Sequence, residues 1–140
     1  ANKPVIGIPT LDILARNSPV KDRLIVTALD ARRSLIYCSA YKYTRGNLRC
    51  KSPYALLTVE ELVKRFPANA VILGDAAALY RKEFLNRIKG SIILDKDYWL
   101  PQTHNLMDLA LAKAKAGQVS SALTVKPIYL YPKECQIRTR

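Results

Sequence analysis

The sequence predicts an α/β fold, with a mixed sheet that contains an antiparallel hairpin and is covered by helices. Three observations predict it. Residues 24–29 form an almost continuous apolar run, and residues 35–43 alternate between two faces. Residues 70–94 then switch from a strand-like pattern to a helix-like pattern and back to a strand-like one.

The chain begins with a segment that predicts a strand followed by a short helix. Residues 4–9 are mostly apolar and suit a short strand. Thr10 suits the N-cap of a helix that continues to about Asn17, and Pro19 prevents its extension. The apolar face of this helix is expected to hold Leu11, Leu14 and Ala15.

The clearest local pattern is a hairpin between residues 24 and 43. Its first strand shows no alternation, which is typical of a strand buried on both faces. A polar corner at residues 30–34 precedes the return strand, whose odd-numbered positions include three tyrosines. Residues 45–47 suit a turn with positive φ, and residues 48–50 are expected to return as a third strand.

A capping box predicts the next helix. The Thr58 hydroxyl can accept from the amide of Glu61, and the Glu61 carboxylate can reach back to the amide of Thr58. The helix is expected to run to Phe66, because Pro67 disfavours its continuation.

Strand and helix patterns then alternate. Residues 70–73 predict a buried strand, and Gly74 with Asp75 forms the turn into a helix over residues 76–88. Asp75 would put a negative charge at an anion site, so it is more typical of a helix cap than of a phosphate-binding turn. The inner face of this helix is expected to hold Tyr80, Phe84, Leu85 and Ile88.

The last third of the sequence predicts a strand, a loop and a helix. Residues 91–94 suit another strand, and a polar aromatic loop leads to Thr103, where the last helix begins. Gly117 is expected to end that helix. Its apolar stripe contains Leu106, Leu109, Ala110 and Ala114. Residues 127–132 are expected to be extended.

Size, charge and composition limit the class of protein. The 140 residues fit one domain, and 49% hydrophobic content is enough for a core. Lys and Arg number 23 against 11 Asp and Glu, a net charge of +12 that favours polyanions such as RNA but also suits a solvated surface. Because no apolar segment approaches about 20 residues and no secretion signal opens the chain, a cytoplasmic location is expected.

The sequence offers little for catalysis, metal binding or a cofactor. Cys38, Cys50 and Cys135 show no Cys-x-x-Cys spacing, which argues against a zinc cluster or a disulfide framework. Cys38 suits a buried small hydrophobe better than a catalytic thiol. His104 is the only histidine, and Asp95 with Asp97 is more typical of a solvated turn than of an acid–base pair. We therefore expect no catalytic residue, no metal and no cofactor.

A basic group is the one candidate binding site. Positive side chains at the hairpin corner and along the neighbouring strands could hold RNA phosphates, with Tyr41 and Tyr43 stacking on bases. The alternative is that the tyrosines cover the core and the charges keep edge strands from pairing. The candidate nucleic-acid residues are Arg32, Arg33, Lys42, Arg45 and Arg49.

The order of these patterns resembles a known family. A strand that ends in Asp-Ala-Arg at residues 30–32, followed by a tyrosine-rich return strand, is similar to the bacterial TsaB proteins, also called YeaZ. Further similar segments keep the family's order and cover almost the whole chain; they are residues 4–15, 71–80, 106–117 and 127–130. The sequence departs from the family at Ser34 and Leu35, where relatives often have glycine and glutamate.

The resemblance implies half of an actin-like, ribonuclease-H-like (ASKHA) fold. Residues 1–17 would be the trailing segment of a missing N-terminal lobe, and residues 18–140 the C-terminal TsaB-like domain. The family's opening strand with its Ile-Asp-Thr-Ser-like turn, and its Gly-Pro-Gly-Ser-Phe-Thr-Gly-like loop, do not occur in this sequence. The chain therefore resembles a C-terminal fragment, and a naturally short protein is the alternative.

The resemblance also implies a function. It indicates a non-catalytic scaffold subunit of the tRNA threonylcarbamoyladenosine modification machinery, which supports the catalytic TsaD subunit beside the ATPase TsaE. The helices that join TsaB to TsaD belong mainly to the half absent here, and tRNA is a further candidate partner. The family's old glycoprotease label is rejected, because no Gly-x-Ser-x-Gly motif is present. The alternatives are a stand-alone basic RNA-binding module and, third, a degenerate small-molecule hydrolase.

Overall fold

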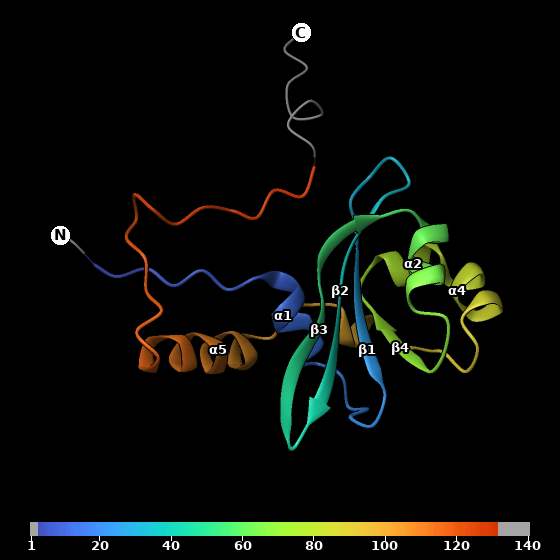
Figure 1. Cartoon of the computed structure of the whole chain (residues 1–140), viewed down its shortest axis with the longest axis horizontal. Helices are drawn as coiled ribbons and strands as arrows, with labels where there is room; N and C mark the ends of the chain where they lie inside the picture. Colours follow the sequence, from blue (N-terminus) through green and yellow to red (C-terminus); the bar gives the residue numbers. More distant parts are fainter. Residues whose placement is uncertain (1–2, 132–140) are drawn as a thin grey trace, which may run out of the picture.

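The apolar run seen in the sequence becomes the central strand of a five-stranded sheet (Figure 1). The structure is a computed structural model that describes residues 3–131. The strands lie in the order β3-β2-β1-β4-β5. Their bounds are β1 Leu24–Asp30, β2 Ile36–Thr44, β3 Asn47–Leu57, β4 Ala70–Leu73 and β5 Ile92–Ile93.

Strand β1 joins an antiparallel half of the sheet to a parallel half. It pairs antiparallel with β2, with Ile25 opposite Tyr41 and Asp30 opposite Ile36. It pairs parallel with β4, which in turn pairs parallel with β5. Residues 25–28 of β1 are buried, so the prediction of a mixed sheet around a strand buried on both faces is confirmed.

The two faces of the sheet carry different helices. One face packs on three helices around a core that includes Val26, Cys38, Ile72 and Phe84. The other face packs on the short helix α1 around a smaller core that includes Ile25 and Val71. The helices are α1 Thr10–Ala15, α2 Val59–Arg65, α3 Ala76–Leu79, α4 Arg81–Arg87, the 3-10 helix η1 Lys96–Tyr98 and α5 Thr103–Lys115.

The start of the chain differs from the prediction. Residues 4–9 join no strand of the sheet, and Val5 makes only an isolated bridge to Ser120. Pro4 and Pro9 lack the amide hydrogens that a ladder needs, which is a physical reason against a strand here. Thr10 is the first residue of α1 and not its cap, because Pro9 occupies the cap position and no side chain caps the helix.

The second hairpin is confirmed, but its return strand is longer than expected. Arg45 and Gly46 have φ of 52° and 76° and form a two-residue turn between paired Thr44 and Asn47. Strand β3 continues well beyond residue 50. It passes through Pro53, which an edge strand tolerates because its amide need not bond a neighbour.

The capping box at α2 is confirmed in detail. The amide of Thr58 donates to Glu61 Oε2 at 2.8 Å, and the amide of Glu61 donates to Thr58 Oγ1 at 3.3 Å. The bond donated by the Thr58 amide, and then the one donated by its hydroxyl, lower the pKa of the Glu61 carboxyl. The helix ends with Phe66 as its C-cap, as the following proline predicts.

The predicted helix over residues 76–88 is wrong as a single element. It divides into α3 and α4 at Tyr80, whose φ of −113° and ψ of 28° are not helical. Phe84 and Ile88 are buried, one turn apart, whereas Leu85 is 46% exposed. The prediction of Leu85 on the inner side is therefore wrong, because a seven-residue helix that presents Phe84 and Ile88 inward turns Leu85 outward.

Gly74 and Asp75 follow β4 in the chain and contact the backbone of β1. Gly74 has φ +117°, and a Cβ there would lie 2.1 Å from the carbonyl oxygen of Ala28. Asp75 occupies the N-cap position of α3 but makes no side-chain bond to that helix. Its Oδ1 instead accepts from the amide of Asp30 at 2.8 Å, so the prediction of a capping aspartate is wrong.

Helix α5 begins and ends where the sequence predicts, but few of its side chains are buried. It begins at Thr103, and Gly117 ends it with φ +69°, with the amide of Gln118 donating to the carbonyl of Lys113. Only Asn105 of this helix is buried, so the predicted apolar stripe is covered in part. Residues 127–131 belong to no helix or strand, and residue 132 lies outside the described part.

The α5 helix, the segment before α1 and the segment after α5 extend from one side of the sheet (Figure 1). No helix within residues 3–131 has the length and apolar content needed to cross a bilayer.

The contact of Gly74 with the Ala28 carbonyl predicts the cost of a substitution. We expect Gly74→Ala to lower the free energy of unfolding by about 3 kcal/mol, because the methyl group clashes with backbone and φ is strained. Urea denaturation followed by circular dichroism measures this loss. Gly46→Ala is the control, since nothing lies within 4 Å of its Cβ position and only a left-handed backbone penalty of about 1 kcal/mol remains. Equal losses in the two variants would contradict the account.

Candidate functional site

The candidate basic residues lie at two ends of the hairpin. Arg32 and Arg33 belong to the β1–β2 connection, and Arg45 belongs to the β2–β3 turn. Strand β2 has nine residues, so these ends are roughly 30 Å apart at about 3.3 Å per residue. The connection and the turn point in opposite directions (Figure 1). The structure therefore divides the candidate site into two groups.

The first group, here called the tip cluster, consists of Lys42, Arg45 and Arg49. Lys42 pairs with Arg49 across β2 and β3, and Arg45 lies in the turn that joins these strands. All three residues are exposed. Neither of the two ion pairs found within residues 3–131 involves any of them. Their positive potential is thus available to a phosphate backbone.

The second group, here called the corner, consists of Arg32 and Arg33. Together with Ser34 they form three consecutive residues of left-handed backbone, with φ of 65°, 52° and 59°. Asp30 holds the corner, because its Oδ1 accepts from the amide of Arg32 at 2.9 Å and its Oδ2 lies 3.5 Å from the guanidinium. The Arg32 charge is thereby partly compensated, whereas no described ion pair involves Arg33.

A tyrosine from the end of the described chain also contacts the corner. The Tyr131 hydroxyl donates to the carbonyl oxygens of Ala31 and Arg32. Its ring meets Tyr37 edge-on, with centroids 6.0 Å apart and an interplanar angle of 85°. Burial, and then the proximity of Tyr131, raises the pKa of Tyr37. The segment after α5 is thus fixed to the first hairpin.

The tyrosines of the second hairpin face the protein interior. Tyr41 is buried, and its hydroxyl donates to Asp12 Oδ1 at 2.6 Å. Tyr54 donates to the same oxygen at 2.7 Å. Burial, and then the bond to Asp12, raises the pKa of both phenols well above the usual range. Tyr43 is half-buried beneath the ammonium of Lys21, so the interpretation that these tyrosines cover the core is confirmed.

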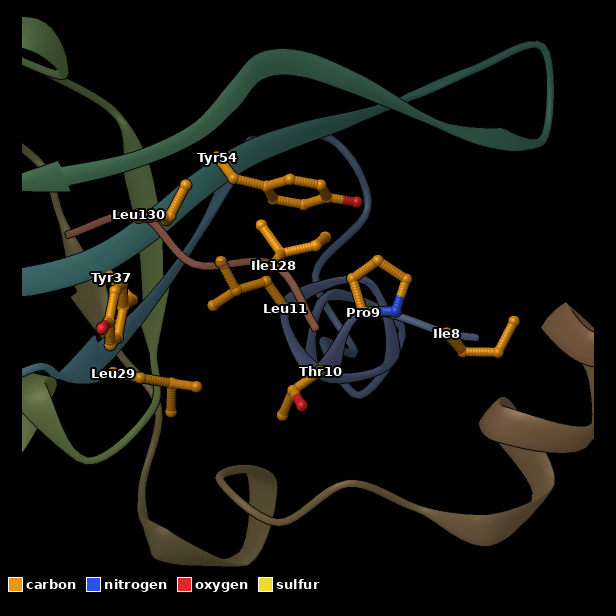
Figure 2. A pocket seen from close by; sticks show the side chains of 9 residues that line it. All are labelled: Ile8, Pro9, Thr10, Leu11, Leu29, Tyr37, Tyr54, Ile128 and Leu130. Atoms are coloured by element: carbon orange, nitrogen blue, oxygen red, sulfur yellow. The ribbon is translucent and has the colours of Figure 1, made fainter. Parts of the chain in front are cut away.

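A small apolar cavity lies beside this aspartate–tyrosine cluster. Figure 2 shows Tyr37 and Leu29 at one end of it and Ile8 and Pro9 at the other. Its volume is about 240 Å³, below the roughly 300 Å³ at which ligand sites usually begin. The nine lining residues are Ile8, Pro9, Thr10, Leu11, Leu29, Tyr37, Tyr54, Ile128 and Leu130. None of these is a carboxylate, imidazole, thiol or cation, so the cavity offers no acid–base chemistry near neutral pH.

Of the two cysteines within residues 3–131, one is buried and the other is exposed. Cys38 is buried within the larger core, and burial raises the pKa of its thiol to about 11. Cys50 is exposed on the edge strand, and its Sγ contacts the carbonyl oxygen of Ser52 at 3.1 Å. Cys135 lies outside the described residues. The interpretation of Cys38 as a buried small hydrophobe is confirmed.

The remaining titratable candidates lie on the surface. His104 is exposed at the start of α5, beside a shallow hollow of about 200 Å³ that Asp97 also lines. Asp95 and Asp97 flank the start of η1 and are both exposed, as expected of a solvated turn. Within residues 3–131, no group of three or more His, Cys, Asp or Glu side chains could hold a metal ion.

The cysteine environments predict different reactivities. In a Cys135→Ser variant, we expect Cys50 to react with a colorimetric disulfide reagent at least about 100-fold faster than Cys38, because the thiolate is the nucleophile and Cys38 is buried. Stopped-flow absorbance at pH 8 measures both phases. Adding Cys50→Ser should remove the fast phase and leave a slow phase that accelerates in denaturant. A fast phase that survives in that double variant would contradict a buried Cys38.

Comparisons with known proteins support the fold. No family model and no curated protein matches this sequence. The structure is similar to that of "an uncharacterized protein with similarity to peptidase YEAZ" from Pseudomonas aeruginosa, with a TM-score of 0.74 and 22% identity over 92% of this chain. It is also similar to YeaZ from Pseudomonas aeruginosa, with a TM-score of 0.72 and 24% identity over 91% of this chain. The chain spans 60% of the length of each.

These similarities are carried by the arrangement of the sheet and helices, since the sequence identities are low. They confirm the fold that the TsaB resemblance implied. The chain has the mixed α/β fold of the YeaZ structures.

Proposed function

We propose that this chain is a non-catalytic scaffold that belongs to the TsaB subunit of the tRNA threonylcarbamoyladenosine machinery. The observation that carries the proposal is the YeaZ fold, which extends over 92% of the chain at a TM-score of 0.74. In this proposal, residues 1–17 are the trailing segment of an N-terminal lobe, and residues 18–140 are the C-terminal TsaB-like domain. The site of action would be the cytoplasm.

The described side chains support a scaffold over an enzyme. The cavity beside α1 is lined by apolar side chains, two tyrosines and Thr10, which have no acid–base role near neutral pH. Cys38 is buried with a raised pKa, and Asp95 and Asp97 are solvated. A group matched to catalysis near neutral pH would need a perturbed pKa inside a cleft, and these candidates do not offer that combination.

The proposed partners follow from the family resemblance. TsaD would carry the ATP-dependent transfer reaction, and TsaE would assist as an ATPase. The role of this protein would be to hold TsaD in its active arrangement, so substitutions here should act through folding and contact, not through a chemical step.

Depletion of the full-length gene product in its own organism tests this function. We expect threonylcarbamoyladenosine in bulk tRNA, quantified by nucleoside mass spectrometry, to fall to background and to return with the wild-type gene. Because no side chain of this chain takes part in the reaction, rescue by Cys38→Ala and by Asp95→Asn/Asp97→Asn should be complete. An unchanged level of the nucleoside would contradict the modification role. Failed rescue by a variant that still folds would contradict the non-catalytic role.

The alternative function is RNA binding by the hairpin itself. The observation that favours it is the tip cluster, whose three cations are exposed and take part in no described ion pair. The corner is a weaker candidate, because Asp30 partly compensates Arg32 and the tip is roughly 30 Å away. Stacking by Tyr41 does not contribute, because that ring is buried.

Salt-dependent tRNA affinity tests this alternative. If the tip cluster binds phosphates, Lys42→Ala/Arg45→Ala/Arg49→Ala should reduce the slope of log K against log salt by about 2, at about 0.7 per single-strand contact. The variant Arg32→Ala/Arg33→Ala measures the contribution of the corner to the same slope. The variant Arg81→Ala/Lys82→Ala removes two exposed charges of α4 and is the control for a general loss of positive charge. A slope that stays the same in the tip variant would remove the tip from RNA binding.

A further inference from the structure

Positive side chains gather at the end of the sheet where the parallel strands begin. Strands β1, β4 and β5 all start at this end, and the turn between β2 and β3 lies there as well (Figure 1). Residues 20–24, 42–49 and 88–91 meet at this end, and Asp22 is the only carboxylate that they contain. We call their cations the basic rim; they are Lys21, Arg23, Lys42, Arg45, Arg49 and Lys89.

Residues 20–24 connect the two sides of the basic rim. The ammonium of Lys21 lies 5.5 Å from the centroid of the Tyr43 ring, on the strand that leads to the tip cluster. The guanidinium of Arg23 donates to the carbonyl oxygen of Gly90 at 2.7 Å, next to Lys89 in the chain. The tip cluster and Lys89 thus belong to one surface.

Backbone bonds fix Lys89 at the beginning of β4 and β5. The amide of Asn69, the residue before β4, donates to the carbonyl oxygen of Lys89 at 2.7 Å. The amide of Lys89 donates to the carbonyl oxygen of Pro67 at 3.1 Å. The basic rim therefore extends from the β2–β3 turn past β1 to β4 and β5, across about 19 Å at about 4.8 Å per strand.

The charges of the basic rim are not neutralised by ion pairs in the described part of the chain. The two ion pairs there join Arg32 to Asp30 and Arg87 to Glu60, so no rim residue takes part. Five of the rim cations are exposed, and Arg23 is half-buried. The contacts with a ring and a carbonyl oxygen orient Lys21 and Arg23 without cancelling their charge.

The opposite end of the sheet has a different charge balance. Asp30 ends β1, Asp75 lies two residues after β4, and Asp95 lies two residues after β5. These carboxylates lie at the same end as the two arginines of the corner. The basic rim has only Asp22 among its segments, so a polyanion is attracted to that end of the sheet in particular.

The side chains of the basic rim suit phosphates and not unpaired bases. Tyr43 is the only aromatic residue in its three segments, and this ring is half-buried beneath Lys21. Proteins that hold single strands usually stack the bases on exposed rings. A double helix keeps its bases stacked on one another and presents phosphates, about one per 3.4 Å along each strand, so the rim could face about five of them.

We propose that the basic rim binds the phosphate backbone of double-helical RNA without reading its sequence. This inference goes beyond the scaffold role, and it rests on the proposed function only in the choice of RNA over DNA. It also differs from binding of RNA by the tip cluster alone, because Lys21, Arg23 and Lys89 extend the site from the hairpin to β1, β4 and β5.

Fluorescence anisotropy with a blunt RNA duplex tests the part of the rim outside the tip cluster. With the 140-residue chain and a duplex of about 16 base pairs, Lys21→Ala/Lys89→Ala should weaken binding at least about tenfold at about 0.1 M salt. The slope of log K against log salt should fall by about 2, at about 0.9 per duplex contact. Lys21→Arg/Lys89→Arg should keep the wild-type slope, because both charges remain. Unchanged affinity and slope in the alanine variant would overturn the proposal.

A matched pair outside the rim separates a local contact from net charge. Arg81→Ala/Lys82→Ala also removes two exposed cations, from α4. We expect its slope to stay within about 0.5 of the wild-type value, since these residues would contact no phosphate. Melting curves by circular dichroism should coincide for the two alanine variants and the wild-type chain. An equal loss of slope in both alanine variants would show attraction by net charge alone and would overturn the proposal.

Three competing polyanions identify the ligand. They are an unstructured uridine strand and a DNA duplex of the same length as the RNA duplex, and polyglutamate of the same charge. We expect the RNA duplex to bind more tightly than the uridine strand and polyglutamate, and at least as tightly as the DNA duplex. Equal or tighter binding of the uridine strand would overturn the double helix as ligand, and tighter binding of DNA would overturn the choice of RNA.

Equal or tighter binding of polyglutamate would assign the basic rim to an acidic protein and overturn the proposal. These measurements use neither TsaD nor the modification assay. A failure here is therefore separate from a failure of the proposed scaffold function.

Discussion

The close approach of Gly74 to the carbonyl oxygen of Ala28 determines how the two halves of the sheet meet. Strand β1 belongs both to the antiparallel hairpin and to the parallel pair with β4, and only a glycine lets the β4 exit pass so near its backbone. Asp75, the next residue, accepts from the amide of Asp30 and so fixes the end of β1. The position of the corner and the helices after β4 follow from this junction.

The two faces of the sheet are covered to different extents. One face closes on α2, α3 and α4. On the other face lie the six-residue α1, held by the bonds of Tyr41 and Tyr54 to Asp12, and the residues around η1. The remaining elements on that side, α5 and residues 119–129, expose apolar side chains. A protein with this distribution of surfaces is suited to assembly, which agrees with the scaffold role proposed for it.

Local signals made much of the fold predictable, and tertiary contacts account for the errors. The hairpin turn at Gly46, the capping box at Thr58 and the stop at Gly117 each depend on neighbouring residues and were predicted. The role of Asp75 depends on a contact with Asp30, 45 residues away, and no local sequence signal marks the break at Tyr80. The Asp12 cluster was missed for the same reason, since its tyrosines are 29 and 42 residues away. The separation of the basic residues, in contrast, was available from the length of the strand between them.

The central claim is that the contact of Gly74 and Asp75 with β1 holds the two halves of the sheet together. The most direct measurement is hydrogen exchange of the Asp30 amide in the Asp75→Ala variant, which loses the carboxylate that accepts from this amide. The account predicts that the Asp30 amide exchanges at least about tenfold faster in the variant, whereas the amides of the β2–β3 pair exchange as before. Unchanged exchange of the Asp30 amide would contradict the account.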